Sequence, residues 1–279
     1  MPSETEILSR LTANPEENTW AAGRAPQLTR IFNLLMTIAQ PLGPTLDIGS
    51  GNGAFYRIFE GFAPNLLPYS CADINGEDIH LSNTTIQVHR FECDKDHLPV
   101  PDQTYGMVLL CDVLEHLIVD PVWTLLEINR VTRIGGHFLI STPNVTSIDR
   151  VLTIAQGRHP GTEHEYKPTS IYDRHNREWT PSEVFSCVGA LGFRLLGWDS
   201  NFLALSDASK LLLQTFRTAG LLRLDDVFFG PELVFVFEKT EHKTLNSELP
   251  IETRWPSYLY TGYSNYRQRP KKFPICTSE

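Results

Sequence analysis

Several features that assign proteins to familiar classes are missing from this sequence. The five cysteines are scattered and form no Cys-x-x-Cys pair, which favours reduced thiols over a disulfide framework. No stretch is long and apolar enough to span a bilayer. The acidic residues 1–6 lack the apolar run of a signal peptide. We therefore expect a cytoplasmic protein that has no membrane partner.

The sequence also has fewer positively charged than negatively charged residues. Lysine and arginine together number 24 against 33 aspartates and glutamates, and the formal net charge is −9 at pH 7. This balance offers no overall attraction to nucleic acid, so a nucleic-acid partner is disfavoured. The one locally basic stretch, residues 267–272, is interpreted as a solvated chain end. A chain of 279 residues with 41% hydrophobic residues suits one large α/β domain with additions.

A glycine-rich stretch at residues 45–53 is the most informative part of the chain. A short apolar strand runs directly into Gly49, Gly51 and Gly53. An amphipathic helix follows, with apolar residues at the spacing of one helical face: Phe55, Ile58, Phe59 and Phe62. Glycine lets the backbone turn sharply and approach a ligand, and the helix N-terminus offers unpaired amides. The pattern predicts a site for a nucleotide-type ligand.

The spacing of the glycines narrows the choice of nucleotide. The stretch reads Gly-x-Gly-x-Gly, whereas a dinucleotide fold has Gly-x-Gly-x-x-Gly and a P-loop has Gly-Lys-Ser/Thr. Asp47 lies two residues before the first glycine, where it would be poorly placed beside a pyrophosphate. Its carboxylate instead suits a cationic or amino-bearing ligand whose own carboxylate faces the loop amides.

Two further strands end in acidic residues. The strand predicted at 67–74 reaches Asp73, 24 residues after Gly49, where a carboxylate accepts the hydrogen bonds of a ribose diol. A turn-forming aspartate is the alternative interpretation. The near-continuous apolar run at 105–111 is typical of a strand buried on both faces, and it ends at Asp112.

The remaining pattern alternates strands and helices, which predicts a parallel sheet covered on both faces. Residues 1–25 are interpreted as a loose lead-in before a helix at 28–36. Helices are predicted from 121 to a stop at Gly135-Gly136, at 147–155, from the capping box at 180–183, and at 208–219; strands are predicted at 86–91, 137–144, 193–198 and 231–237. The predicted organisation is a lead-in and helix (1–43), a main domain (44–240) with insertions at about 145–178 and 200–230, and a tail (241–279).

The segment Leu46–Gly53 closely resembles the first motif of class I S-adenosylmethionine (SAM)-dependent methyltransferases. The resemblance covers roughly residues 44–240 and includes several motifs in the family's order: Asp73, Asp94, residues 112–117, Gly135-Gly136, residues 141–144, residues 177–183 and Gly192-Phe193. The motifs look most like the branch of ubiquinone-type, sugar and natural-product O-methyltransferases. The resemblance implies a Rossmann-like α/β fold with a seven-stranded, mostly parallel sheet, helices on both faces, an antiparallel last strand and a small lid formed by the insertions.

The resemblance also implies SAM as cofactor and a set of residues that bind it. The methionine end would lie along Asp47, Gly49, Ser50, Gly51 and Gly53, the ribose at Asp73 and Ile74, the adenine at Asp94 and Lys95, and the sulfonium beside Cys111 and Asp112. Glu92 is a less favoured substitute for Asp94 in the adenine contact.

The expected reaction is methyl transfer to a small-molecule acceptor, with a hydroxyl oxygen favoured. In-line displacement depends on alignment, and a hydroxyl acceptor also needs a base. His116 is the catalytic candidate because histidine titrates near neutrality, although it could instead pack beneath the site. His159, His164 and His175 are further candidates for substrate contact, each more simply interpreted as a surface histidine. No metal ligand is assigned in this hypothesis.

Two alternative hypotheses remain. Glu115-His116, together with residues 175–180, resembles the metal-binding pattern of small-RNA 2′-O-methyltransferases, although Asp112 stands where that family has glutamate. The substitution and the acidic charge argue against this RNA-modifying enzyme. A non-catalytic SAM-fold scaffold is the third hypothesis, because a fold does not prove chemistry. The intact glycine loop and acids argue against it.

Overall fold

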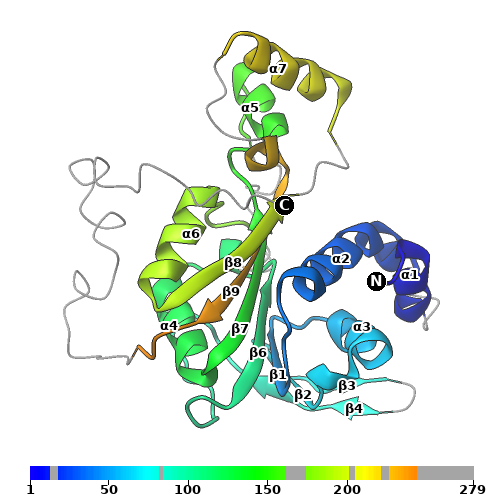
Figure 1. Cartoon of the computed structure of the whole chain (residues 1–279), viewed down its shortest axis with the longest axis vertical. Helices are drawn as coiled ribbons and strands as arrows, with labels where there is room; N and C mark the ends of the chain where they lie inside the picture. Colours follow the sequence, from blue (N-terminus) through cyan, green and yellow to red (C-terminus); the bar gives the residue numbers. More distant parts are fainter. Residues whose placement is uncertain (13–17, 82–83, 161–173, 201–204, 221–225, 244–279) are drawn as a thin grey trace.

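A seven-stranded sheet forms the centre of the protein in the computed structural model, which describes residues 1–12, 18–81, 84–160, 174–200, 205–220 and 226–243 (Figure 1). The strands follow one another across the sheet in the order β5-β2-β1-β6-β7-β9-β8. Their bounds are β1 Thr45–Ile48, β2 Tyr69–Asp73, β5 Val88–Arg90, β6 Tyr105–Cys111, β7 Thr132–Pro143, β8 Phe193–Ser200 and β9 Glu232–Lys239.

The pairing of the strands matches the predicted Rossmann-like fold. β1 pairs in parallel with β2 and β6, β2 with β5, and β6 with β7, whereas β9 is antiparallel to both β7 and β8. The chain runs from β1 outward to β5 and then crosses back to β6 on the other side of β1. The carboxyl ends of β1 and β6 therefore flank the topological switch point, where open sheets of this kind bind ligands.

Helices cover both faces of the sheet (Figure 1). One face carries α1 (Glu4–Leu11), α2 (Asn18–Ile38) and α3 (Ala54–Phe62), and the other carries α4 (Pro121–Val131) and α6 (Pro181–Ala190). Alternate residues of β6 contribute to different cores: Val108 and Leu110 pack with the α4–α6 side, and Met107 and Leu109 with the α1–α3 side. This double burial explains why β6 is apolar along its length.

The N-terminal segment is helical, so the prediction of a loose lead-in over residues 1–25 was wrong. Ser3 and Glu6 form a capping box in which the Ser3 amide donates to Glu6 Oε2 at 2.8 Å and the Glu6 amide donates to Ser3 Oγ at 3.3 Å. Ile7 and Leu11, one helical turn apart, are fully buried. Polar residues between the apolar ones concealed this short amphipathic helix, and α2 starts ten residues before the predicted helix.

Two other predicted boundaries were also wrong. The strand predicted at 86–91 is divided between β4 (Thr85–Ile86), which pairs with β3 (Ile79–His80) in a separate hairpin, and β5 of the main sheet. β7 starts at Thr132, so Gly135-Gly136 lie inside a strand instead of ending a helix. Short 3-10 helices lie at η2 (Pro64–Leu66), η3 (Leu114–His116) and η5 (Asp226–Phe229).

Two helices from the predicted insertions pack together beyond the end of the sheet (Figure 1). They are α5 (Ile148–Ala155) and α7 (Asp207–Thr218), joined by a hydrogen bond from Ser209 Oγ to Asp149 Oδ1. The rest of the insertions and the tail from residue 244 lie partly or wholly outside the described residues. Among the helices that the structure describes, none combines the length and apolar character needed to cross a bilayer.

Candidate active site

A pocket of about 340 Å³ lies at the carboxyl ends of β1 and β6, and we call it the β1–β6 pocket. One wall is the glycine loop and the tip of β6, and the opposite wall is the N-terminal half of α2. Its lining residues are Trp20, Arg24, Gln27, Leu28, Ile31, Asp47, Gly49, Ser50, Gly51, Asn52, Ala54, Phe55, Cys111 and Asp112. The pocket thus gathers six of the residues predicted from the sequence.

The glycine loop has a backbone that other residues would strain. Gly49 and Gly51 have φ values of +72° and +51°, in the left-handed region that favours glycine. A Cβ on Gly49 would lie 2.3 Å from Val113 Cγ2, whereas a Cβ on Gly51 would meet no protein atom within 4 Å. Gly51 therefore leaves its backbone open to a ligand in the pocket. Gly53 caps α3 and lies outside the pocket lining.

Asp47 presents a buried carboxyl to the β1–β6 pocket. Only 2% of the residue is exposed, and the Tyr69 hydroxyl donates to Asp47 Oδ2 at 2.6 Å. Burial raises the pKa of Asp47 to about 7, with a smaller contribution from the charge of Asp73. A cation bound beside Asp47 would favour the ionised carboxylate.

Asp112 joins the tip of β6 to α2. Its φ is +54°, a conformation that aspartate tolerates better than most residues. Asp112 Oδ1 accepts from Ser141 Oγ at 2.8 Å. Asp112 Oδ2 accepts from Arg24 Nη1 at 2.9 Å and from Gln27 Nε2 at 3.1 Å. Asp112 is therefore anchored to β7 on one side and to α2 on the other.

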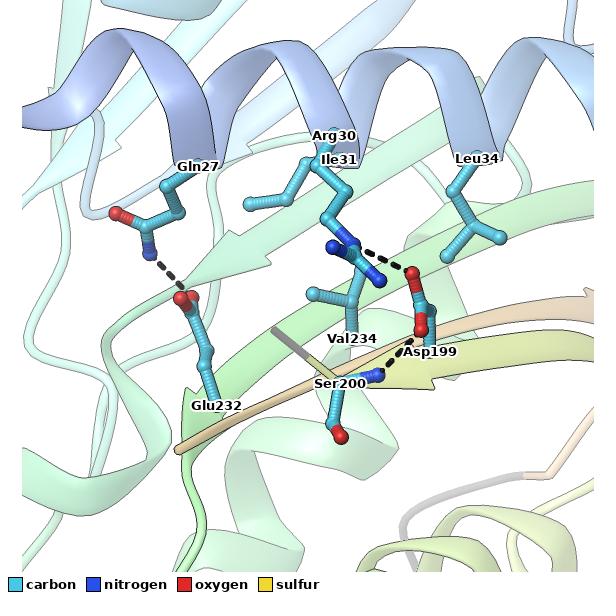
Figure 2. A pocket seen from close by; sticks show the side chains of 8 residues that line it. All are labelled: Gln27, Arg30, Ile31, Leu34, Asp199, Ser200, Glu232 and Val234. Atoms are coloured by element: carbon cyan, nitrogen blue, oxygen red, sulfur yellow. Dashed lines mark hydrogen bonds and ion pairs between the residues drawn. The ribbon is translucent and has the colours of Figure 1, made fainter. Parts of the chain in front are cut away.

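Figure 2 shows how the flank of α2 is held against the sheet. Gln27 Nε2 also donates to Glu232 Oε1 at the start of β9, and Arg30 Nε donates to Asp199 Oδ2 of β8 at 2.6 Å. Burial, together with the nearby charge of Asp112, holds the pKa of Glu232 well above its ordinary value. The first link connects α2 to β9 and the second connects it to β8, so side-chain contacts with the sheet help to position the helix that forms one wall of the pocket.

The residues predicted for the ribose and the adenine lie outside the lining of the β1–β6 pocket. Asp73 and Ile74 are half-buried at the end of β2, and Asp73 Oδ1 accepts from the Asn75 amide at 3.2 Å. Asp94 is buried, and its carboxylate accepts from the backbone amides of Ile118, Val119 and Asp120 at 2.9, 3.2 and 3.1 Å. Asp94 therefore shapes the loop after η3. The neighbouring Lys95 is exposed and pairs with Glu92 at 2.6 Å.

A second group of side chains lies just beyond β6, and we call Glu115, His116 and His175 the Glu–His–His cluster. The Nε2 atoms of His116 and His175 each lie 4.0 Å from Glu115 Oε1. Glu115 is 1% exposed, and burial raises its pKa to about 8, with Asp112 adding to the effect. One ligand atom from each residue lies within 4.8 Å of the others. The two imidazole rings and the carboxyl group therefore face a common point.

Backbone and side-chain hydrogen bonds fix the Glu–His–His cluster. The amide of Asn176 donates to the carbonyl of Glu115 at 2.7 Å, and Asn176 Nδ2 donates to the carbonyl of His116 at 2.8 Å. His116 Nδ1 lies 3.1 Å from the carbonyl of Arg174, and His175 Nδ1 lies 3.1 Å from Glu178 Oε1. Such outer partners orient each ring so that Nε2 faces Glu115.

The structure places the predicted histidines in different environments. His175 is buried in the Glu–His–His cluster, so its interpretation as a surface histidine was wrong. His159 is exposed, as that interpretation expects, and His164 lies outside the described residues. The α2 residues of the β1–β6 pocket were missed altogether. Their positions 20, 24, 27, 28 and 31 have helical spacing, and this periodicity can be recognised in the sequence. The periodicity does not predict that this face of the helix lies opposite the glycine loop.

Comparison with known proteins identifies the family. The model of the methyltransferase domain family matches residues 20–196, which is more than half of the chain. The chain belongs to this methyltransferase family. The match begins within α2, so it includes the helix that forms one wall of the β1–β6 pocket.

A curated relative and two solved structures are similar to the chain. A probable S-adenosylmethionine-dependent methyltransferase from Mycolicibacterium smegmatis is 30% identical over 128 residues, which cover 46% of this chain and only 38% of that relative. A SAM-dependent methyltransferase from Archaeoglobus fulgidus has a TM-score of 0.52 at 18% identity, covering 80% of this chain and 97% of that one. A chain of the Haloferax volcanii complex between the Trm112 methyltransferase activator and a putative methyltransferase has a TM-score of 0.50 at 17% identity, covering 82% and 98%. The two structures support the fold.

SAM is the cofactor that the name of the curated relative gives for that protein, and the β1–β6 pocket fits this cofactor in size and charge. The volume of about 340 Å³ lies within the usual range for small-molecule sites, roughly 300–1,000 Å³. SAM carries a sulfonium and an ammonium cation, and the pocket lining includes the carboxyls of Asp47 and Asp112. The open backbone at Gly51 leaves room for the ligand beside the loop.

Proposed function

We propose that this methyltransferase transfers the methyl group of SAM to a hydroxyl oxygen of a small molecule. The observation that carries the proposal is the Glu–His–His cluster, which begins three residues after Asp112 of the β1–β6 pocket. A hydroxyl acceptor must lose a proton during methyl transfer, and the cluster supplies groups that accept one. Nitrogen acceptors, which carry a reactive lone pair, have less need of such a cluster.

Within this proposal the cofactor spans the switch point of the sheet. Asp47 and the glycine loop, with Ser50, bind the methionine end, and Cys111 and Asp112 lie beside the sulfonium. Asp73 and Ile74 bind the ribose, while Asp94 and Lys95 bind the adenine. Asp94 already holds the loop at 118–120, so it would act at the adenine largely by shaping that loop.

His116 is the proposed base. If His116 Nδ1 carries a hydrogen and donates it to the Arg174 carbonyl, Nε2 of the neutral ring bears the lone pair. That nitrogen faces Glu115 Oε1, whose carboxyl is held partly protonated near neutral pH by its raised pKa of about 8. A proton taken from the acceptor hydroxyl by His116 would therefore remain close to Glu115 and His175, the two buried members of the Glu–His–His cluster.

A second candidate is metal-assisted methylation of an RNA 2′-hydroxyl. The observation that favours it is again the Glu–His–His cluster, because two imidazoles and a carboxylate form a common ligand set for zinc, manganese and iron. A bound cation lowers the pKa of a coordinated hydroxyl, which would replace the base. The fourth residue of the resembling pattern, Asp112, binds Ser141 and α2 instead. The net charge of −9 also opposes RNA binding.

Metal content and acceptor use separate the two candidates. Purified enzyme is analysed for bound metals, stripped with a chelator, and assayed for transfer of labelled methyl groups to hydroxylated small molecules and to short RNA. The small-molecule proposal predicts activity on a phenol or alcohol that survives chelation and is lost in His116→Ala. Activity that appears only with RNA and added manganese or zinc would support the second candidate. Failure of the wild type to bind SAM would instead favour the scaffold hypothesis.

A further inference from the structure

Glu232 is an acid next to the β1–β6 pocket to which the proposed function assigns no role. It lies at the start of β9, and Gln27 Nε2 donates to its Oε1 atom (Figure 2). The same nitrogen donates to Asp112 Oδ2 at 3.1 Å, so one amide group holds the two carboxyls together. Burial, the charge of Asp112 and a hydrogen bond with its carboxyl hold the pKa of Glu232 well above its ordinary value. Two carboxyls in such contact share one proton.

The charged and titratable groups that face Glu232 come from three neighbouring elements. They are Asp112 and the Cys111 thiol at the tip of β6, Arg24 and Arg30 on α2, and Asp199 on β8. Arg30 and Asp199 pair with each other at 2.6 Å. Arg24, the only cation among the described residues that line the pocket, pairs with Asp112 at 2.9 Å. One guanidinium therefore faces two carboxyls, and one of the two carboxyls keeps a proton.

A small polar cavity adjoins the Glu232 carboxyl. Its volume is about 10 Å³, and its lining residues are Gln27, Arg30, Ile31, Leu34, Asp199, Ser200, Glu232 and Val234 (Figure 2). About one water molecule fits a cavity of roughly this volume when polar groups line it. A water molecule at this place would hydrate the ionised carboxylate of Glu232 and exchange a proton with it.

The charge of the cofactor changes during the reaction. When the methyl group leaves SAM, the S–CH3 bond breaks and its electron pair stays on the sulfur. The cationic sulfonium becomes the neutral thioether of S-adenosylhomocysteine (SAH). The acceptor oxygen forms the new bond to the methyl carbon and loses its proton, which His116 accepts in the proposed function. The position beside Asp112 thus loses one positive charge.

We propose that Glu232 binds a proton when the sulfur of the cofactor is neutral and releases that proton when the sulfur is charged. With SAM bound, the sulfonium beside Asp112 offsets one carboxylate, so both acids ionise. With SAH bound, Arg24 is again the only cation, and Glu232 takes up a proton from water. Glu232 therefore favours SAM over its product increasingly as the pH rises. This inference rests on the proposed position of the sulfonium beside Asp112 and is independent of the acceptor.

Calorimetric titration of SAM and of SAH into the full chain tests this coupling. Titrations in two buffers with different heats of ionisation count the protons that each ligand releases. Between about pH 7 and pH 8.5, the ratio of SAM affinity to SAH affinity should rise more steeply with pH in the wild type than in Glu232→Gln, by up to about tenfold per unit. Glutamine keeps the contact with Gln27 and does not ionise. Ionisation of the free ligands is the same for every variant, so it cancels in the comparison.

Glu238→Gln is the matched control. Glu238 lies on the same strand, pairs with Arg194 and does not line the pocket, so this variant should behave as the wild type does. Asp112→Asn removes the neighbouring charge and should flatten the ratio as Glu232→Gln does.

Equal pH dependence of the ratio in the wild type and Glu232→Gln would overturn the proposal and leave SAM as cofactor. A wild-type protein that binds neither ligand would overturn the cofactor assignment itself. Unfolding temperatures of all variants, measured in parallel, separate loss of binding from loss of the fold.

Discussion

At the scale of single residues, the site depends on two buried carboxyls, those of Asp47 and Glu115. Asp47 accepts a hydrogen bond from the Tyr69 hydroxyl, and Glu115 accepts one from the Thr142 hydroxyl. Burial raises the pKa of these acids to about 7 and about 8. Near neutral pH each acid therefore responds to what binds beside it. A cationic cofactor would ionise Asp47, and a proton or a metal ion would occupy the position at Glu115.

The affinity for SAM should fall as the pH falls below 7. The pKa of Asp47 is about 7 in the free protein, and we expect a bound cation to lower it, so binding below pH 7 must release a proton. Affinity should therefore rise with pH by up to about tenfold per unit towards pH 7, and the slope should flatten above it. Calorimetry from roughly pH 5.5 to pH 7 measures the slope, and Asp47→Asn should remove it. A wild-type slope equal to that of Asp47→Asn would contradict the role of Asp47.

At the scale of elements, α1 and α2 complete the α/β domain. α1 packs on α2 and α3, and α2 in turn packs against β8 and β9. Hydrogen bonds from Gln27 and Arg30 reinforce this contact (Figure 2). Because the same helix lines the β1–β6 pocket, the stability of the N-terminal helices and the shape of the site are connected.

Removing a core side chain from α1 should destabilise the whole domain. Ile7 is fully buried, so Ile7→Ala should lower the free energy of unfolding by about 2–4 kcal/mol through lost burial and a cavity. Urea denaturation monitored by circular dichroism measures the change. Glu4→Ala, in the exposed first turn of the same helix, should stay within about 0.5 kcal/mol of the wild type. Equal stability of both variants would mean that α1 is dispensable.

At the scale of the whole molecule, local patterns predicted most of the sheet and one side of the site. Short-range hydrophobic patterns predict the strand before Gly49 and the strand before Asp112. The order of these strands in the fold then predicts where the switch point of the sheet lies. Contacts between distant segments could not be predicted in this way. Arg24 meets Asp112 across 88 residues, and His175 meets Glu115 across 60, because the folded sheet brings their elements together.

The same limit explains what the sequence concealed at Asp94 and α1. The position of Asp94 fits the family pattern. However, three backbone amides of the loop at 118–120 donate hydrogen bonds to its carboxylate, and no local sequence pattern predicts that contact. The Ser3-x-x-Glu6 capping box is a helix-start signal that can be recognised in the sequence. Only two buried residues follow it in the helix, and a helix of eight residues is too short to show a clear hydrophobic periodicity.

The central claim is that the switch point of this sheet binds SAM, and calorimetric titration of SAM and S-adenosylhomocysteine tests it most directly. Asp73 is the proposed partner of the ribose diol, and Glu77 is an exposed acid four residues later that serves as control. We predict micromolar binding to the wild type and to Glu77→Ala, weakened by about 100-fold or more in Asp73→Ala because two hydrogen bonds to a carboxylate are lost. Absence of binding to the wild type, or equal binding to all three proteins, would contradict the account.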